Sequence, residues 1–262
     1  MSKSAKALAE APEVIRAAVL AGVPHGFFGR RGGISQGLVA GLNVGWGAGD
    51  DLAAVQHNRA LAVAAVMPGG ALVTVYQIHS AACVSSTKPW PDEQRPHADA
   101  IVTDRPGLVL GVVTADCAPV LLADRAAGIV GAAHAGWKGA VAGVTDQVIG
   151  EMEALGASRD RIVAAIGPCI AQANYEVDQV FVEQFCKIDK CNRRFFAAGR
   201  AGHAQFDLED YVAARLESAG VGTVERLALD TYPDPARFYS FRRATHLGEP
   251  NYGRQIALIG LK

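Results

Sequence analysis

Three apolar runs that follow one another closely between residues 108 and 133 constrain the fold of this chain more than any other feature. They cover residues 108–114, 119–123 and 128–133, and each has the length and the aliphatic, partly β-branched content of a buried strand. The links between them are too short for the helical crossover that joins neighbouring parallel strands. We therefore expect mixed or antiparallel sheets with helices outside them, an α+β fold, rather than strict βαβ alternation.

Shorter patterns predict the remaining elements. Further strands are expected over 71–79, 99–103, 161–167, 224–229 and 254–260, with 82–86 as a partner for 71–79 and a turn at 104–107 before the run at 108–114. Helices are expected over 13–21, from an Asp50 or Asp51 cap to Val66, and over 139–155, 177–186 and 208–219. Residues 25–51 are rich in glycine and lack periodicity, which predicts a long ordered loop of functional importance.

Composition describes an ordinary folded protein of 262 residues, 50% hydrophobic and 19% charged. We expect a short N-terminal extension with one helix over residues 1–24 and a single catalytic domain over 25–262, with a monomer favoured.

The net charge of -1 and the lack of a basic run argue against nucleic acid as a partner. No apolar run approaches the roughly 18 residues of a membrane span, and residues 1–11 do not resemble a secretion signal. Five scattered cysteines predict free thiols and a cytoplasmic location.

Reactive side chains stand at the ends of the predicted strands. Cys117 follows the first of the three apolar runs, His134 follows the third, and His79 ends the strand expected at 71–79. Two imidazoles and one thiolate suit zinc with a fourth position open for water, the arrangement of catalytic zinc. The same donors also suit copper. The alternative is a metal-free pair in which His134, as a base, activates the Cys117 nucleophile.

The neighbours of these side chains are expected to shape a pocket. Asp116 precedes Cys117, and burying its carboxylate costs several kcal/mol unless it is paired, a cost that often marks a site. Trp137 is expected to form a wall of the pocket. Lys138 opens the helix expected at 139–155, whose first amide groups favour an anion.

Several segments in order along the chain resemble the YfiH-like laccase-domain family. They include HGFFGRRGG, VYQIHS, TADCAPVLLAD, AAHAGWKG and FYSFRR, and the resemblance runs from about His25 to the C-terminus. It implies an α+β fold of mixed sheets covered by helices, shared with bacterial toxin deamidases that use a Cys–His pair. It also implies a zinc-type site at His79, Cys117 and His134. One departure is Asp230, where relatives often carry cysteine, and it bears on local packing.

The activity that the resemblance implies is phosphorolysis of purine nucleosides, with adenosine deamination as a second activity. The partners would be a purine nucleoside and phosphate, and the cofactor zinc, with copper as the other metal that the donors suit. The family was first described as polyphenol oxidases, but a four-copper laccase needs many histidine ligands, and this chain has only seven scattered histidines. The zinc-deaminase signature is absent, so an aspartate would have to take the place of its glutamate.

Candidates for substrate binding follow from the chemistry of a phosphorylase. Arginine grips phosphate in a bidentate way, so Arg30 in the glycine-rich segment and Arg242 near the C-terminus are candidates for the anion. Asn43 and Gln77 are candidates for sugar or base, and Asp99 and Asp116 for acid–base work or for orienting a ligating histidine. Lys138 completes the set. The sequence leaves open a non-catalytic nucleotide-binding module and a cysteine hydrolase, including one that edits peptidoglycan precursors.

Overall fold

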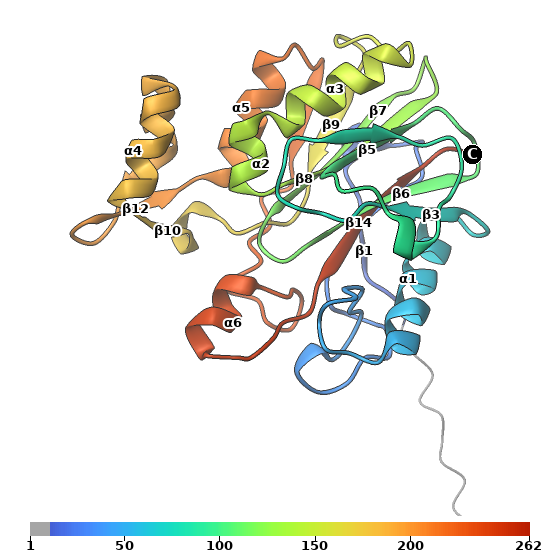
Figure 1. The fold of residues 1–262 in the computed structure, drawn as a ribbon, viewed down its shortest axis with the longest axis horizontal. Helices are drawn as coiled ribbons and strands as arrows, with labels where there is room; N and C mark the ends of the chain where they lie inside the picture. The colour runs from blue at the N-terminus through green and yellow to red at the C-terminus, as the bar shows by residue number, and fades with distance from the viewer. Residues whose placement is uncertain (1–10) are drawn as a thin grey trace, which may run out of the picture.

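Two large β-sheets form the centre of the molecule, and a small third sheet stands to one side of them (Figure 1). A computed structural model describes residues 11–262, so residues 1–10 of the expected N-terminal extension lie outside the described residues. In spatial order, the five-stranded sheet comprises β1 (Val14–Ile15), β2 (His25–Phe28), β14 (Gln255–Gly260), β6 (Leu108–Thr114) and β3 (Ala71–Thr74). The six-stranded sheet comprises β13 (Thr223–Arg226), β9 (Val163–Ile166), β7 (Ala118–Asp124), β8 (Ile129–Ala135), β5 (Ala100–Thr103) and β4 (Cys83–Ser85). The small sheet comprises β10 (Glu176–Asp178), β12 (His203–Phe206) and β11 (Phe196–Ala198).

The two large sheets pack face to face, and the alternation of side chains along their strands builds three cores. On β7, Leu121 lies in the core between the sheets, whereas Val120 and Leu122 lie in the core under the helices. On β6, Leu110 lies between the sheets, whereas Val109 lies in a third core with residues of the first long helix. Full burial of each such side chain contributes roughly 1.5–3 kcal/mol. Strands buried on both faces therefore show as the continuous apolar runs of the sequence.

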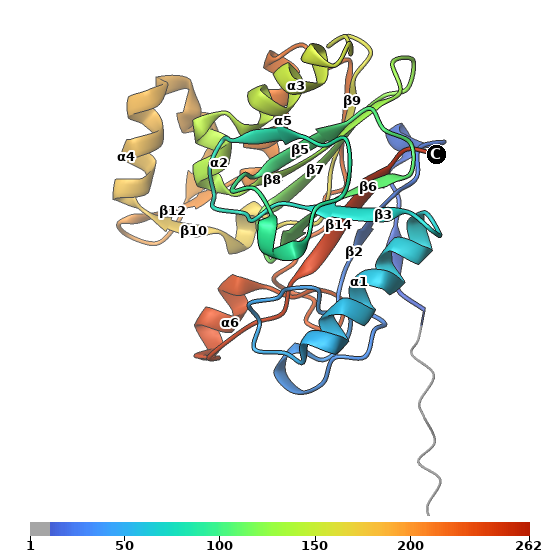
Figure 2. The same ribbon diagram turned by 45° about the vertical axis from the view of Figure 1, so that its right-hand side comes forward.

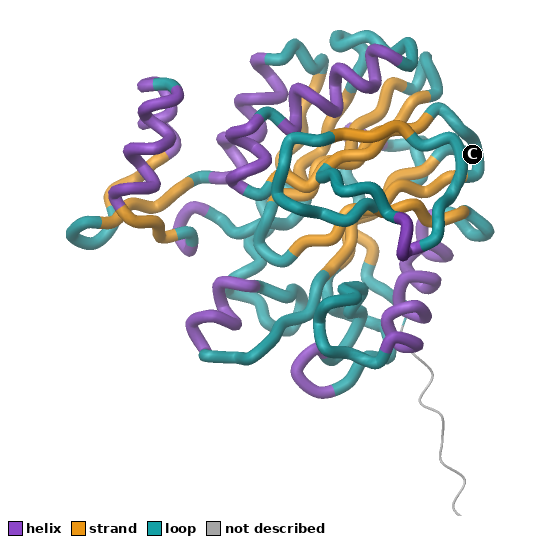
Figure 3. The backbone as a smooth tube through the Cα atoms, in the orientation of Figure 1, coloured by secondary structure: helices purple, strands orange, loops and turns teal. Residues whose placement is uncertain are grey.

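Helices cover the outer faces of both large sheets (Figure 2). The five-stranded sheet carries α1 (Leu52–Val66), and the six-stranded sheet carries α3 (Val144–Ala154) and α5 (Leu208–Ser218). The shorter helices are α2 (Trp137–Ala142), α4 (Gln179–Ile188) beside the small sheet, and α6 (Phe241–Leu247). Long loops surround α6 at the lower end of the view (Figure 3). None of the helices between residues 11 and 262 has the length and apolar character that a membrane span requires.

The expected α+β class is confirmed, with mixed sheets and helices outside them. The strands expected at 108–114, 119–123 and 128–133 are present as β6, β7 and β8, and the α1 helix starts from an Asp51 cap whose side chain accepts the Ala53 N–H. The expected pairing of 82–86 with 71–79 is wrong. β3 pairs with β6, and β4 pairs with β5, both in parallel, so the two segments belong to different sheets. A period-two pattern identifies a strand but does not choose its partner.

Other expected elements are wrong in detail. Residues 13–21 form β1 and a 3-10 turn at Ala18–Leu20 rather than a helix, because Val14 pairs with Phe28 of β2. The helix expected at 139–155 is two helices, α2 and α3, broken where Gly143 adopts a φ of 93°. The loop expected at 25–51 begins with strand β2, and the helix expected at 177–186 begins only after strand β10. The other strands of the small sheet, and α6, were not expected.

One buried histidine predicts how the fold responds to acid. Nε2 of His25 accepts the Ala17 N–H at 2.9 Å, and Nδ1 donates to the Val23 carbonyl at 2.8 Å, so the ring is held neutral. Burial lowers the pKa of His25 below its ordinary value of 6.5. Above pH 6.5 neither the folded nor the unfolded state gains a proton here. Below it the unfolded state binds a proton that the folded state resists, so stability falls by up to about 1.4 kcal/mol per pH unit.

We expect His25→Asn to lose this component of the pH dependence. The measurement is the free energy of unfolding by denaturant at pH 7 and pH 5 for both proteins. The wild type should lose more stability than the variant over this interval, whatever the absolute stability of the variant. Equal losses in the two proteins would contradict a neutral, buried His25.

Candidate metal and substrate site

His79, Cys117 and His134 come together in one cluster. Their ligand atoms all lie within 4.8 Å of one another, and Sγ of Cys117 is 4.0 Å from Nε2 of His79. The two imidazole rings meet edge to face with centroids 4.8 Å apart. His79 is exposed, Cys117 half-buried and His134 buried, so the cluster opens to solvent on one side.

Strand register brings two members of the cluster together. β7 and β8 are antiparallel, with Pro119 opposite His134 and Ala118 opposite Ala135. Cys117 directly precedes Ala118, where the chain passes from β6 of the five-stranded sheet to β7 of the six-stranded sheet. Gly136 directly follows Ala135, between β8 and α2. The backbone of Cys117 is therefore fixed on both sides, by β6 of one sheet and β7 of the other.

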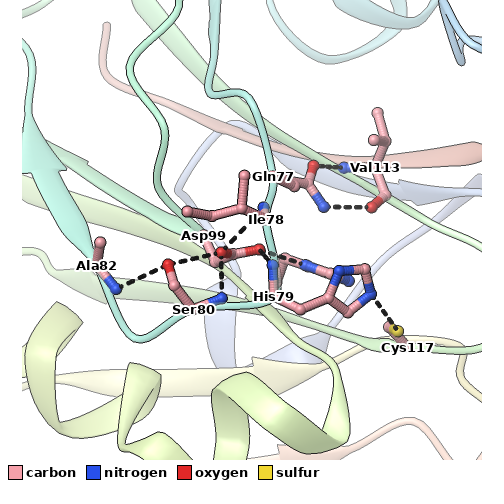
Figure 4. Close-up of polar contacts among 9 residues, drawn as sticks. Gln77, Ile78, His79, Ser80, Ala82, Asp99, Val113 and Cys117 are labelled. Carbon is pink, nitrogen blue, oxygen red and sulfur yellow. Dashed lines mark hydrogen bonds and ion pairs between the residues drawn. The ribbon is translucent and has the colours of Figure 1, made fainter.

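Asp99 holds the other two members in place. It lies opposite His134 across the β5–β8 pairing, and its Oδ1 is 2.8 Å from Nδ1 of His134. Its carboxylate also accepts the backbone N–H groups of Ile78, His79 and Ser80 and the Ser80 hydroxyl (Figure 4). Burial alone would raise the pKa of Asp99, but the bonds from His134 and Ser80 and the His134 charge outweigh it and hold the pKa at about 2.

The backbone of His79 is bent to meet this carboxylate. His79 has a φ of 59°, a left-handed conformation that costs a non-glycine residue roughly 1–3 kcal/mol. The turn points three successive N–H groups at Asp99, and these bonds offset the strain. Asp99 thus positions both His79, through its backbone, and His134, through its ring. It makes the contact expected of a residue that orients a ligand.

The Cys117 thiolate and the His134 imidazolium each stabilise the charged form of the other. Burial alone would raise the pKa of the Cys117 thiol, but the positive charge of His134 and hydrogen bonds from both histidines outweigh it and lower the pKa. Burial alone would lower the pKa of His134, but the Cys117 thiolate and Asp99 raise it. The resulting thiolate is the form that binds a metal or acts as a nucleophile.

Asp116 anchors the chain beneath Cys117. It has a φ of 82°, and its buried carboxylate accepts the hydroxyls of Thr231 at 2.6 Å and Ser240 at 2.9 Å and the Arg242 N–H at 2.6 Å. Burial raises the pKa of Asp116, while these bonds act against that shift. Because three donors already bond the Asp116 carboxylate, its role in the structure is to hold the backbone turn that precedes Cys117.

A cavity of about 520 Å³ opens beside the cluster, within the size range of small-molecule sites. His79 and Cys117 form part of its wall. The remainder is largely aromatic and apolar, with Trp137, Tyr175, Phe181 and Phe241 as the large rings. Trp137 and Phe181 pack against each other with ring centroids 4.8 Å apart. We call this space the aromatic cavity.

Two of the expected substrate-binding residues line the aromatic cavity. Lys138 is exposed at the start of α2, and Arg242 lies with its guanidinium 5.1 Å from the Tyr175 ring centroid. Nη1 of Arg242 donates to the Glu176 carbonyl at 2.8 Å, which fixes the side chain across the small sheet. The structure therefore brings these two cations to the same space as the cluster.

The other three expected residues make structural contacts. Both polar atoms of the Gln77 amide bond the backbone of Val113 at 2.8 Å, so this side chain continues the pairing of β3 with β6 (Figure 4). Asn43 is fully buried, and its amide bonds Asp50 and backbone N–H groups. Arg30 donates to backbone carbonyls of its own loop and of the 235 region. Gln77 lies near the cluster, whereas neither Asn43 nor Arg30 lines a cavity there.

Sequence reasoning missed the walls contributed by Tyr175 and Phe181. Both come from the region of the small sheet and α4, where short strands gave no clear pattern. Aromatic residues spaced along 175–185 were the available signal. At the Asp230 departure, the carboxylate accepts the Ala171 N–H and the Asn174 side chain, which is a local packing role.

The cluster fits a metal ion on the chemistry of its donors. Two imidazoles and a thiolate form a three-ligand set for zinc, and the open side leaves room for a fourth ligand. The Asp99 contact occupies Nδ1 of His134, which directs Nε2 toward the other ligands. Gly136 supplies the space, because a Cβ there would lie 3.0 Å from Sγ of Cys117 and 3.0 Å from Cδ2 of His79.

We expect Gly136→Ala to damage the cluster while preserving the fold. Gly136 has a φ of -67° and a ψ of 159°, which alanine adopts readily, so the clash falls on the cluster alone. Bound metal should drop at least tenfold, as for a misplaced ligand. Gly150→Ala is the control, since a Cβ there meets no atom within 4 Å and should stabilise α3 by up to about 1 kcal/mol. Metal binding by Gly136→Ala equal to that of the control would contradict the packing argument.

Comparison with known proteins shows the family and the fold of the chain. The sequence model of the family described as multi-copper polyphenol oxidoreductase laccase matches residues 24–262. A protein named purine nucleoside phosphorylase from Deinococcus radiodurans is 39% identical over 251 residues, which cover 95% of this chain and 92% of that protein. A crystal structure of a Neisseria meningitidis protein has a TM-score of 0.86 and 32% identity, covering 97% of this chain and 100% of the other. The crystal structure of Bacillus licheniformis YfiH has a TM-score of 0.84 and 27% identity, covering 96% and 97%.

Proposed function

The chain belongs to the multi-copper polyphenol oxidoreductase laccase family, and on this premise we propose that it is a purine nucleoside phosphorylase with a metal site at His79, Cys117 and His134. The observation that carries the proposal is the position of this cluster in the wall of the aromatic cavity. A purine is flat, aromatic and apolar on its faces, which matches walls made of Trp137 and Tyr175. The name of the Deinococcus radiodurans relative supports the same reaction.

In the proposed reaction the chain binds the purine between aromatic walls and keeps the sugar close to the cluster. Lys138 and Arg242 supply positive charge at the cavity wall for polar groups of the substrate. Asp99 keeps His134 in one tautomer and fixes the backbone of His79. A zinc ion held by the cluster would supply a Lewis acid and an acidic bound water. Zinc is our proposed cofactor, and copper suits the same three donors.

The way the histidines are grouped in the structure argues against the four-copper oxidase chemistry that the family description suggests. A four-copper laccase needs a blue-copper site and a three-copper cluster, both ligated mainly by histidine. Between residues 11 and 262, one cluster of three His, Cys or acidic side chains has the spacing to hold a metal, and it contains two histidines. This favours a single-metal site and nucleoside chemistry over four-copper oxidation.

A second candidate is a metal-free cysteine hydrolase. The observation in its favour is the line Asp99–His134–Cys117, with an acid holding a histidine beside a thiol of lowered pKa. An amide bond, including one in a peptidoglycan precursor, would be a substrate for such a pair. This mechanism needs Cys117 and His134 but gives His79 no direct part.

The deciding experiment incubates the purified protein with adenosine or inosine, with and without phosphate, and resolves the products by chromatography. Release of free base only with phosphate supports the phosphorylase. Conversion of adenosine to inosine would add the deaminase activity that we also propose. Free base without phosphate dependence, or neither product, would contradict phosphorolysis. Metal analysis, and the same assay after chelation, distinguish the zinc enzyme from the metal-free hydrolase.

A further inference from the structure

A second cavity of about 300 Å³ lies beside the same cluster. It shares His79, Ala115 and Cys117 with the aromatic cavity, and His134 also lines it. Its other walls come from the glycine-rich segment at 45–47, the segment after β3, the end of β6 and the residues just before β14. The cluster therefore stands where two cavities of different chemistry meet.

The second cavity is lined by three arginines. Arg59, Arg95 and Arg254 all line it, and its lining contains no aspartate or glutamate. The lining of the aromatic cavity, in contrast, includes Asp116 and Glu176. Asp92 lies outside this lining and pairs with Arg59 at 3.7 Å and with Arg95 at 3.4 Å, whereas Arg254 makes no ion pair within the described residues. An anion bound here would interact favourably with all three guanidinium groups. We call this second space the arginine cavity.

Arg59 is a buried cation in this wall. The residue is only 6% exposed, and its Nε donates to the Val44 carbonyl at 3.0 Å. Its guanidinium stacks on the Trp46 ring at 4.8 Å, and the Asp92 carboxylate at 3.7 Å belongs to a side chain that is 45% exposed. Burial lowers the pKa of Arg59 to about 10, which leaves it fully charged at neutral pH. A charge this buried interacts strongly with any anion that enters.

Two other donors at the arginine cavity, unlike Arg59, lack an acceptor. Nη1 of Arg254 and Nε1 of Trp46 are buried and have no hydrogen-bond partner within the described part of the chain. Buried donors in native proteins are nearly always paired, so an acceptor from a ligand or an ordered water is expected at these two atoms. Arg254 is held ready for it, because its stem lies against Gly45, where a Cβ would be 2.8 Å from Cδ, and its guanidinium stacks on Tyr252 at 4.6 Å.

We propose that the arginine cavity binds the inorganic phosphate of the reaction, with Arg59, Arg95 and Arg254 as its cationic ligands. The assignment rests on the proposed phosphorylase function and extends it. Phosphate offers several acceptor oxygens and up to two negative charges, which suits three guanidinium groups and the free indole N–H. The nucleoside occupies the aromatic cavity, so its ribose reaches the junction at His79 and Cys117.

The two-cavity arrangement places the reactants on opposite sides of the sugar. A phosphate oxygen forms a bond to ribose C1′ as the bond from C1′ to the purine nitrogen breaks. The bonding electrons leave with the purine, which takes up the proton that the attacking hydrogen phosphate loses, and the products are ribose 1-phosphate and the free base. The step needs no further reactant. Holding both partners at fixed positions lowers its entropic cost.

The test replaces Arg254 with Met, which keeps the packing stem and removes the charge. We expect the KM for phosphate to rise at least tenfold in Arg254→Met, while the KM for the nucleoside stays within about twofold. Arg95→Met tests the same wall from another element, in case the first variant folds poorly. Arg105→Met is the control, since Arg105 is an exposed arginine in the turn before β6, at the end of that strand remote from the cluster.

Direct binding separates this proposal from the proposed function. Titration calorimetry with inorganic phosphate and no nucleoside should show binding to the wild type and Arg105→Met, and at least tenfold weaker binding to Arg254→Met. That pattern supports the site even if the nucleoside assays fail. Phosphorolysis with a phosphate KM unchanged in both Arg254→Met and Arg95→Met would overturn the site and leave the phosphorylase intact. Absence of phosphate binding to the wild type would overturn the site as well.

Discussion

Cys117→Ala and His79→Ala are each expected to lower nucleoside turnover by about a thousandfold or more and to abolish stoichiometric metal binding. Each variant removes one of three ligands, and loss of a catalytic metal forfeits several kcal/mol of transition-state stabilisation. His79 is exposed, so its truncation leaves no buried cavity, and the thermal midpoint of that variant should stay within a few degrees of the wild type. Steady-state kinetics, metal analysis and thermal unfolding check the three parts of this prediction.

Two surface variants serve as matched controls. Cys191 is an exposed thiol and His57 an exposed imidazole on α1, so Cys191→Ala and His57→Ala remove the same chemical groups elsewhere. Both should retain wild-type turnover and metal content. If Cys117→Ala is inactive but His79→Ala and the chelated wild type remain active on an amide substrate, the metal-free hydrolase is the better description. Turnover of nucleoside within tenfold of the wild type in both ligand variants would remove the cluster from the mechanism.

Asp99→Asn is expected to have the second largest effect, on both stability and metal affinity. Each carboxylate oxygen of Asp99 accepts more than one hydrogen bond, so either orientation of an asparagine amide sets its NH₂ group against N–H donors. Loss of charged, buried hydrogen bonds of this kind costs about 2–4 kcal/mol. The turn at residues 78–80 and the His134 ring both lose their anchor, so metal affinity should fall by roughly 10–100-fold.

A second buried aspartate provides the comparison for this variant. Asp124 is 1% exposed and accepts bonds from Arg161 and from the Ser158 and Ala127 N–H groups at the far end of β7. Asp124→Asn should lower stability by a similar mechanism while metal affinity stays unchanged. Denaturant unfolding and competition with a zinc indicator measure the two quantities. Equal losses of metal affinity in the two variants would show that Asp99 acts only through general stability.

The sequence pattern predicted those features that depend only on neighbouring residues in the chain. The apolar runs around Cys117 and His134 predicted β6, β7 and β8 because a strand buried on both faces has to be apolar throughout. An aspartate cap for α1, at Asp50 or Asp51, followed from the residue type, and the structure places it at Asp51. Cys117 and His134 at the ends of such strands indicated two members of the cluster, and family resemblance pointed to all three positions. The strand expected over 71–79 is wrong at its end, because β3 stops at Thr74 and His79 lies in the segment beyond it.

Pairing between distant segments lay beyond local pattern. The sequence suggested that 82–86 pairs with 71–79, but β3 and β4 take partners in different sheets. Arg30 and Arg254 look alike as surface arginines in a sequence. Arg30 reaches carbonyls of its own loop, whereas Arg254 has an unpaired, buried Nη1 at the second cavity. Gln77 looks like a substrate ligand but completes a strand pairing with Val113.

The sequence by itself therefore determined the α+β class, the central strands β6, β7 and β8 of the two large sheets, and the identity of the three clustered side chains. Only the tertiary structure decided which sheet each strand joins, the role of Asp99 as the common anchor of His79 and His134, and the division of the site into aromatic and arginine cavities. The physical reason is that hydrophobic period and capping are properties of neighbouring residues. Hydrogen-bond partners, burial of charge and cavity walls depend on segments that meet only when the chain is folded.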